Sequence, residues 1–359
     1  MSKIEKKRKK WVEILAVAGT ISLAVLAGIG LANGDKILKN AGKDEEKENL
    51  ISVGFSQVGA ESGWRTGNSV SIKETFSAKK GYALIFEDAQ QRQEQQIKSI
   101  RSFIQQGVNY IILAPVVETG WDTVLKEAKA AHIPVIIADR KVKVKDESLY
   151  TTWVGADFYQ EGTKACSWLN KYAKKNGREN LNIVQIQGTP GATAQIGRTK
   201  ALEDAAAEYG WTIMDQKDGE FTQAKGQEVM EMYLEQYKDI DVVYCDNDNE
   251  ALGAITAIKN AGKKLGPEGI SVVSFDASKE GLQAVKNGEI AVDVECNPEF
   301  GSEIEKIIKM IEYGRSVDKE YYIADKVFAE TEDIPSIEVG KIKWDVIPVT
   351  EDIIKKRRY

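Results

Sequence analysis

The sequence has 359 residues, 42% of them hydrophobic, and a formal net charge of −6 at pH 7. A chain of this length can form two domains, each with a substantial core. Residues 1–32 contain six Lys or Arg and two Glu, which leaves about −10 for the remainder. An acidic globular part argues against nucleic acid as a partner, because nucleic-acid binding requires a basic footprint.

Cofactors and metals have few residues available to them. Cys166, Cys245 and Cys296 have no CxxC spacing and are too few for a disulfide framework, so we expect buried free thiols. His132 is the single histidine, so the sequence argues against catalysis by histidine and against a zinc site. No GxGxxG, P-loop or DxDxDG-type pattern occurs. We therefore expect no cofactor and no metal.

Residues 1–33 have the pattern of a targeting segment. A basic stretch precedes residues 14–32, which are apolar throughout and about 19 residues long. That length lies between the core of a signal peptide and a membrane span, so a cleaved signal peptide and a membrane anchor both remain open. Residues 34–49 form a charged linker. We expect the protein to be exported to the periplasm or the cell surface, where residues 14–32 are either removed or retained as an anchor.

After the linker, short apolar runs alternate with helical patterns in two successive series. The first series predicts strands at 51–55, 83–86, 110–114 and 135–138, with helices at 64–80, 93–106 and 121–131. The second predicts strands at 182–187, 212–214, 242–245, 271–275 and 290–295, with helices at 159–176, up to 209, up to 230 and up to 261. Such alternation indicates parallel sheets. Its restart predicts two doubly wound α/β domains with a cleft between them.

Polar and aromatic residues recur at the carboxyl ends of these strands, where open α/β sheets bind ligands. An indole suits the C–H face of a sugar, and Arg, Asp, Glu and Gln suit its hydroxyls. Each residue alone could be a solvated loop charge, a helix cap or a packed ring, but together they favour a polyhydroxylated ligand. The candidate ligand-binding residues are Gln57, Glu61, Trp64, Arg65, Gln91, Asp139, Arg140, Arg198, Phe221, Asn247, Asp276 and Glu295.

A resemblance to a known family covers about residues 51–330 and weakens from Thr331 to Tyr359. It is carried by the stretches VGFSQVGAESGWR, DAQQRQEQQIKSIRSFIQQGV, ILAPVVETGWDTVLKEAKAAHIPVIIADR, VQIQGTPGATAQIGRTKAL, GEFTQAKGQEVME, YCDNDNEALGAITAIKNAG and SFDASKEGLQAV. These stretches resemble the periplasmic-type sugar-binding proteins of ABC importers, of the ribose/galactose type, and among them the galactofuranose-binding branch.

The resemblance implies a type I periplasmic binding protein fold, in which a hinge of three chain crossings joins the two doubly wound domains. We expect crossings near 154–157, 295–299 and 323–328. The N-terminal domain would take residues 50–154 plus 298–323, and the C-terminal domain 155–297 plus 324–350. The resemblance also implies that Trp64 lies against the sugar ring and that Asp139 and Arg140 bind hydroxyls. Glu295 departs from the Gln that is common in relatives.

The function implied by the resemblance is the capture of a monosaccharide, galactofuranose or a related aldose, by a monomer that delivers it to an ABC transporter permease. A membrane-anchored sugar sensor that acts on a receptor kinase is the alternative. A glycosidase would need a carboxylate pair that nothing in the sequence singles out, so we expect no enzyme. A transcriptional regulator of this fold would need a DNA-binding headpiece, where this chain has an apolar segment.

Overall fold

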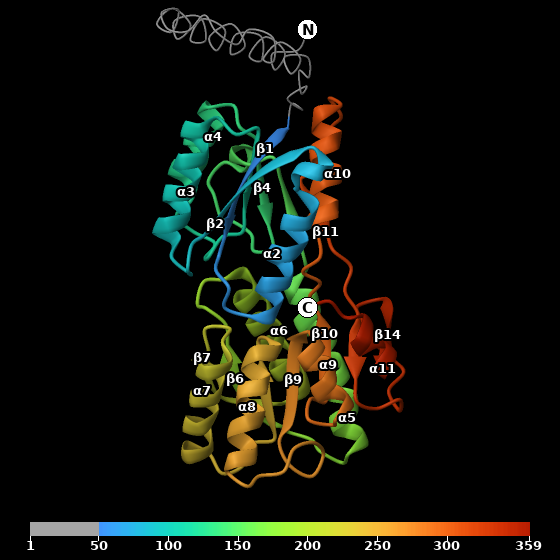
Figure 1. Cartoon of the computed structure of the whole chain (residues 1–359). Helices are drawn as coiled ribbons and strands as arrows, with labels where there is room; N and C mark the ends of the chain where they lie inside the picture. The colour runs from blue at the N-terminus through green and yellow to red at the C-terminus, as the bar shows by residue number, and fades with distance from the viewer. Residues whose placement is uncertain (1–49) are drawn as a thin grey trace, which may run out of the picture. The chain divides into compact units, whose positions relative to one another are not determined.

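The computed structural model describes residues 50–359 and folds them around two β-sheets (Figure 1). The predicted signal or anchor segment (1–33) and the predicted linker (34–49) lie outside the described residues. Within residues 50–359, none of the helices combines the length and the apolar character that a bilayer crossing requires.

The first sheet has six parallel strands in the order β11-β5-β4-β3-β1-β2. Its first five strands along the chain follow the doubly wound order 2-1-3-4-5. The strands are β1 (Ile51–Gln57), β2 (Tyr82–Asp88), β3 (Tyr110–Leu113), β4 (Val135–Ala138), β5 (Thr152–Gly155) and β11 (Glu320–Tyr322). The helices packed with them are α2 (Gly63–Thr75), α3 (Gln93–Gln106), α4 (Asp122–Ala130) and α10 (Gly301–Glu312), with short 3₁₀ turns η1 (Ala78–Lys80) and η2 (Glu147–Leu149). We call this sheet and its helices the N-lobe.

The second sheet has eight strands in the order β13-β14-β12-β10-β9-β8-β6-β7, which repeats the 2-1-3-4-5 order in β6 to β10. Antiparallel pairing joins β10 to β12 and β13 to β14 at its far edge. The strands are β6 (Asn182–Gln187), β7 (Thr212–Asp218), β8 (Val242–Cys245), β9 (Ser271–Asp276), β10 (Val292–Glu295), β12 (Val327–Ala329), β13 (Ser336–Val339) and β14 (Ile342–Pro348). The helices are α5 (Phe158–Lys175), α6 (Thr193–Tyr209), α7 (Gln223–Gln236), α8 (Asp248–Asn260), α9 (Lys279–Lys286) and α11 (Glu351–Lys356). We call this sheet and its helices the C-lobe.

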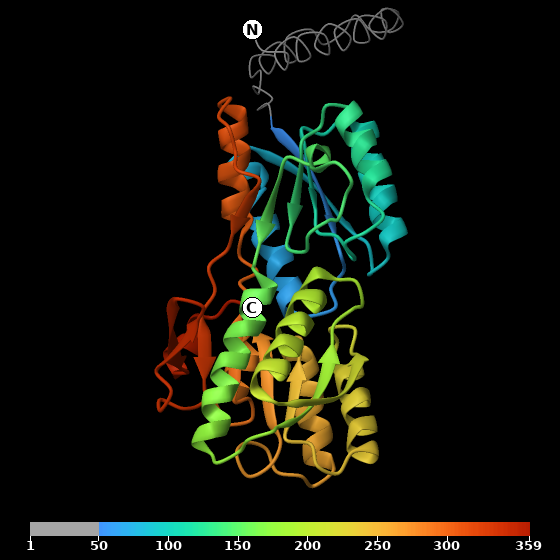
Figure 2. The same cartoon turned by 180° about the vertical axis from the view of Figure 1, so that it is seen from behind.

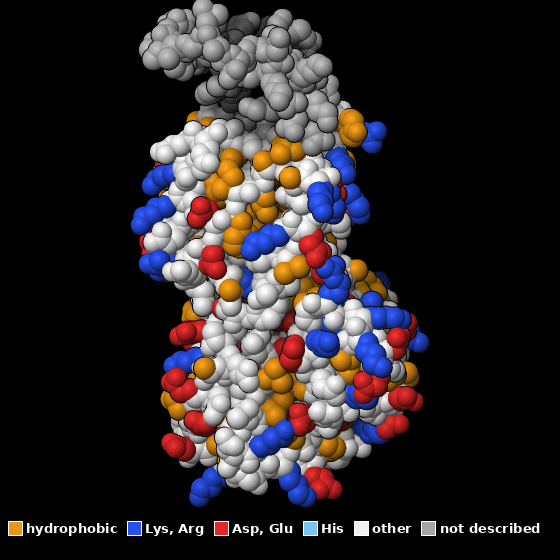
Figure 3. Space-filling model, viewed as in Figure 1, with side chains coloured by type: hydrophobic (Ala, Val, Ile, Leu, Met, Phe, Trp, Pro, Cys, Tyr) orange, Lys and Arg blue, Asp and Glu red, His pale blue; other side chains and the backbone are white. Residues whose placement is uncertain are grey.

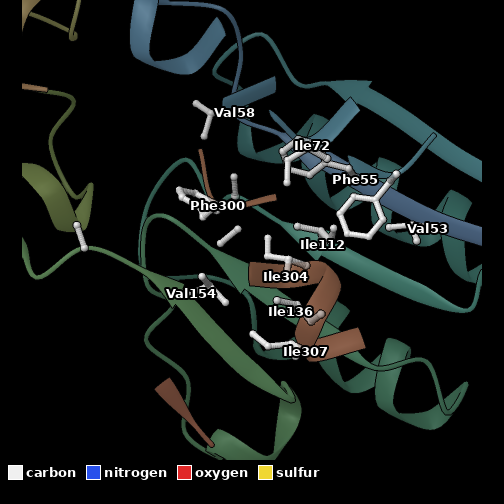
Figure 4. Packing of buried hydrophobic residues seen from close by; sticks show 14 of the residues in the cluster. Val53, Phe55, Val58, Ile72, Ile112, Ile136, Val154, Phe300, Ile304 and Ile307 are labelled. Carbon is white, nitrogen blue, oxygen red and sulfur yellow. The ribbon is translucent and has the colours of Figure 1, made fainter. Parts of the chain in front are cut away.

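Alternation along the strands divides the core of each lobe between the two faces of its sheet. In β3, Ile112 belongs to the cluster with Ile72 of α2 and Ile304 of α10, part of which Figure 4 shows. Its neighbour Ile111 belongs to the opposite cluster, with α3 and α4. A Cβ added at Gly54 of β1 would lie 2.5 Å from the ring of Phe103, so this glycine lets α3 pack closely on the sheet.

The chain passes between the two sheets three times, at residues 156–157, 296–300 and 323–326 (Figure 1 and Figure 2). All three passages lie within or beside the expected crossings. The predicted fold class, two doubly wound α/β lobes joined by a three-crossing hinge, is therefore confirmed. The antiparallel edge of the second sheet was not part of that prediction.

Several predicted bounds are wrong in ways that have a physical reason. The helix predicted over 64–80 ends at Thr75, because Phe76 turns inward and packs edge-on against Tyr82 of the next strand. The strand predicted over 212–214 extends to Asp218. It lies at the edge of the sheet, where half-buried polar residues are tolerated and the apolar pattern ends early.

Figure 3 shows acidic and basic side chains interspersed on one face of both lobes.

Candidate functional site

A cavity lies where the carboxyl ends of the parallel strands of the two sheets face each other. It encloses about 310 Å³ of empty space, its opening to solvent included. Both lobes line it, with Glu61, Ser62, Trp64, Arg65, Asp139 and Arg140 from the N-lobe, Phe158, Ala194, Arg198, Phe221, Asn247 and Asp276 from the C-lobe, and Cys296 from the second crossing.

Arg65 organises the N-lobe side of the cavity. Its Nη2 lies 2.8 Å from Asp139 Oδ2, and its Nε donates to Glu61 Oε1 at 2.9 Å. Arg140 lies beside this group, with its Nη2 at 3.9 Å from Glu61 Oε1 and its Nη1 donating to the Val116 carbonyl at 2.7 Å. All four charged side chains are buried. Charges this far from water are stabilised only by such pairing and hydrogen bonding.

The pairing sets the protonation of these groups. Burial alone would raise the pKa of Glu61, but the charges of Arg65 and Arg140 outweigh it and lower that pKa. Burial, followed by repulsion from Arg65, lowers the pKa of Arg140 to about 10. Glu61, Arg65 and Arg140 are therefore charged at neutral pH. Glu61 is a carboxylate with one oxygen, Oε2, that is buried and has no hydrogen-bond partner among the described residues.

Trp64 presents its ring rather than its polar edge to the cavity. Its indole N–H donates to the carbonyl of Cys296 at 2.5 Å, which satisfies the only polar group of the side chain. The guanidinium of Arg65 lies 4.6 Å from the ring centroid, and Phe300 packs against the ring at 6.2 Å. The indole is thus held by Cys296 and Phe300, which lie in a segment that connects the two lobes, and by Arg65 of its own helix. An apolar ring held beside free hydrogen-bonding groups suits a sugar, which has apolar C–H faces and polar hydroxyls.

Arg198 organises the C-lobe side. Its Nη2 and Nε donate to Glu161 Oε2 at 2.8 and 3.1 Å, and Nη2 lies 3.8 Å from Asp276 Oδ1. Its guanidinium also lies over the ring of Phe275, 4.6 Å from the centroid. Burial raises the pKa of Asp276 well above its usual range despite the attraction of Arg198, because the carboxylates of Asp248, Glu161 and Asp139 add to the effect.

Asn247 and Phe221 complete the C-lobe side. Asn247 caps α8 through a reciprocal box with Glu250, and its Nδ2 donates to the carbonyl of Phe221 at 3.1 Å. The Phe221 ring occupies the space above Gly188, where an added Cβ would lie 1.9 Å from a ring carbon. The backbone of Phe221 has φ of 57°, and its N–H donates to Glu250 Oε1 at 2.8 Å. Glu250 therefore holds both Asn247 and Phe221 in place.

The lobes also contact each other directly around the cavity. The Gly63 N–H donates to Asn249 Oδ1 at 3.2 Å, and the Glu118 N–H donates to the Gly191 carbonyl at 3.0 Å. Arg140 lies over the ring of Phe221 at 5.0 Å. The described residues are therefore in a closed arrangement, in which the lining side chains are largely withdrawn from water.

The cavity brings together nine of the twelve candidate residues, namely Glu61, Trp64, Arg65, Asp139, Arg140, Arg198, Phe221, Asn247 and Asp276. The other three lie outside its lining. Gln57 is buried behind Arg65 and donates to Asn68 at 2.9 Å. Gln91 is only partly buried in the loop after β2. Glu295 faces a second cavity and forms an ion pair with Arg357.

Four lining residues were not among the candidates. Ser62 caps α2 through its side chain, and a serine directly before a helix is the ordinary sign of a cap rather than of a ligand contact. Phe158 and Ala194 lie in the first turns of α5 and α6, and as apolar helix residues they gave no indication of ligand binding in the sequence. Cys296 was expected to be a packed free thiol; all three cysteines are indeed free and buried, and this one also lines the cavity.

Two closed α/β lobes around a buried polar cavity define a protein that binds a small ligand between its lobes. A family model for the periplasmic binding protein domain matches residues 53–299. The chain belongs to this family.

Three similar proteins are named for a sugar or solved with one bound. Galactofuranose-binding protein YtfQ of Escherichia coli (strain K12) is 44% identical over 252 residues, which cover 69% of this chain and 78% of that protein. A Mycobacterium smegmatis protein solved with β-D-fucofuranose has a TM-score of 0.75 and 42% identity, covering 78% of this chain and 92% of that one. The binding protein of the arabinose ABC transporter from Shewanella sp. ANA-3, solved with α- and β-L-arabinofuranose, has a TM-score of 0.74 and 44% identity over the same shares.

Proposed function

We propose that this protein captures a monosaccharide in its furanose ring form, galactofuranose or a related aldose such as arabinofuranose, and delivers it to an ABC importer. The observation that carries the proposal is the closed polar cavity, whose lining includes the ring of Trp64 and Glu61, a carboxylate with one oxygen unpaired among the described residues. Three similar proteins named for furanose sugars or solved with them support the ring form.

The chemistry of the lining fits sugar hydroxyls, each of which can donate and accept. Glu61 Oε2 can only accept, so it suits a hydroxyl donor. Arg140 and Arg198 can only donate, and the raised pKa of Asp276 lets its carboxyl group do either. A sugar that lacked one of the matching hydroxyls would leave a buried charge without a partner, which makes such a site selective.

Locked-ring sugars test the ring form directly. Calorimetry would compare 1,4-anhydrogalactitol, a five-membered ring, with 1,5-anhydrogalactitol, a six-membered ring, alongside D-galactose, L-arabinose, D-fucose and D-ribose. We expect the five-membered ring to bind at least ~10-fold more tightly, a difference of about 1.4 kcal/mol. Preference for the six-membered ring would contradict the furanose assignment, and no binding to any aldose would contradict the sugar itself.

The proposal includes a destination and a location. We propose that the protein is exported, acts as a monomer outside the cytoplasmic membrane, and docks on a permease in its closed form, with residues 14–32 as a removable signal or a retained anchor. Genes for a permease and an ATPase beside this one would support import, whereas a sensor kinase in their place would favour the sensor alternative.

We also propose that the sugar leaves unchanged. Glu61 and Asp139 are both paired with Arg65, which suits them to holding hydroxyls rather than to transferring protons. Recovery of intact sugar after incubation with the protein, including a 4-nitrophenyl galactofuranoside, is the expected result. Release of nitrophenol above the rate in buffer would show an enzyme instead.

A further inference from the structure

Asp276 reaches the cavity from an unusual backbone conformation. It is the last residue of β9, with φ of 107°, and Ala277 follows with φ of 52°. Residues other than glycine rarely adopt positive φ, and two in succession persist only where the surroundings hold them. Since Asp276 lines the cavity, whatever holds this turn also sets where its carboxyl group lies.

The buried carboxyl groups of Asp293 and Asp248 hold the backbone of this turn by hydrogen bonds. The Ala277 N–H donates to Asp293 Oδ1 at 2.9 Å, and the Ser278 N–H donates to Asp248 Oδ2 at 2.7 Å. Asp293 lies in the middle of β10, and Asp248 is the first residue of α8. The other oxygen of Asp248 accepts from Ser274 Oγ at 2.6 Å, so Asp248 is bonded on both sides of Asp276.

These two carboxyl groups also act on each other. Both are fully buried and accept from the N–H groups of consecutive residues, so their charges interact. Asp293 Oδ2 is buried and has no donor among the side chains and backbone groups of residues 50–359. Two ionised carboxylates would repel each other in this position, whereas a single proton between them supplies the missing donor and removes one charge.

The surroundings favour that proton. Burial, and then the charge of Asp248, raises the pKa of Asp293 well above its usual range, and burial raises the pKa of Asp248. Asp276 on β9 adds repulsion, and the thiol of Cys245 on β8 faces Asp248. The nearby cation is Arg357, which is already paired with Glu295. From α9, Gly281 approaches so closely that an added Cβ would lie 2.1 Å from Asp248 Oδ2.

We propose that Asp248 and Asp293 share one proton and act as a positioning pair, which holds residues 274–278 so that Asp276 can bind the ligand. The effect on affinity rests on the proposed sugar-binding function, but the pair itself does not. Because the protonated pair is the one that holds the turn, this restraint is present at every pH below the raised pKa of the pair. It is lost as pH rises through the raised pKa of the pair, and sugar affinity then falls.

The variant Asp293→Asn separates this role from a merely structural one. An asparagine can accept from the Ala277 N–H through Oδ1 and donate to Asp248 through Nδ2, so it reproduces the restraint without a proton. Titration with D-galactose and L-arabinose should give an affinity within ~3-fold of the wild type at pH 7, and a smaller fall between pH 7 and 9.5. Asp293→Ala, which has no acceptor, should lose at least ~10-fold at every pH. Asp276 and Arg140 also titrate, but they are present in all three proteins.

A second measurement needs no sugar. In protein labelled with ¹³C at the aspartate carboxyl carbon, the wild type should show a resonance that titrates well above the usual range of an aspartate and is absent in Asp293→Asn. If no aldose binds while this resonance is present, the proposed function fails and the pair stands. If sugar binds, equal losses in Asp293→Asn and Asp293→Ala, or a wild-type spectrum without the resonance, overturn the pair.

Discussion

At the scale of residues, the cavity depends on small side chains that leave room for large ones. Gly188 is the strongest case, because the Phe221 ring lies where a Cβ would be. The charged residues depend on partners that do not line the cavity, and Glu161 is an example. It is fully buried and binds Arg198 through one oxygen. Such supporting residues decide the positions of the groups that would touch a ligand.

Gly188→Ala should therefore weaken sugar binding without removing any polar contact. The added methyl group must displace Phe221, and overpacking of this kind costs about 1–3 kcal/mol. We expect affinity to fall roughly 10-fold or more, as measured by calorimetry. The matched control is Gly63→Ala, since a Cβ there meets nothing within 4 Å. Equal affinities for the two variants would show that Phe221 does not shape the site.

At the scale of elements, equivalent strand ends in the two lobes share a positive φ but do not always carry the same side chain. Asp139 follows β4 and Asp276 ends β9, the fourth strand of each series, and both have positive φ. After the second strand of each series, Gln91 and Phe221 also have positive φ. Only Phe221 of this second pair lines the cavity, so equivalent positions need not share a role.

The C-terminal segment is a second feature at this scale. Tyr359 packs against α2, where a Cβ added at Gly67 would lie 2.6 Å from its own, and its carbonyl accepts from the Lys279 N–H of α9 at 2.6 Å. Arg358 pairs with Glu74 of α2 at 2.7 Å and with Glu299 of the second crossing at 3.0 Å. Residues 357–359 thus connect both lobes and a crossing in the closed arrangement.

Deleting residues 357–359 should make closure less favourable. The buried Glu295 would also lose Arg357, its ion-pair partner. Because a smaller closed population lowers apparent affinity in proportion, we expect calorimetry to show a loss of roughly 5- to 10-fold. Lys356→Ala is the control, since that side chain is exposed and pairs only with its helix neighbour Asp352 among the described residues. Unchanged or tighter binding after the deletion would contradict the role of this segment.

At the scale of the whole described unit, the charged residues that line the cavity are divided between the lobes. Arg65 and Asp139 come from one side of the cavity, and Arg198 and Asp276 from the other. A ligand can reach both sets only when the lobes are closed, so it favours the closed form by its difference in affinity. In the proposed function, closure is therefore the step that would couple sugar binding to recognition by the permease.

Small-angle scattering with and without sugar measures this coupling. The radius of gyration of the wild type should decrease on saturation, and an unchanged value would leave closure without support. Asp276→Ala should cost about 1–3 kcal/mol of binding, because it leaves the groups it faced without a partner, and should reduce the decrease. Lys175→Ala, on an exposed part of α5 and paired with Asp333, should change neither.

The sequence by itself determined the doubly wound fold and most of the cavity, because alternation of strands and helices forces parallel strand ends to one edge. Glu61, Asp139 and Asp276 could be placed there from their positions after predicted strands. Tertiary structure alone decided that Glu295 turns to Arg357 and that Cys296 lines the cavity. It also decided that Asp248 and Asp293 hold the two residues that follow Asp276. These outcomes depend on contacts between segments far apart in the chain, which no local pattern of residues records.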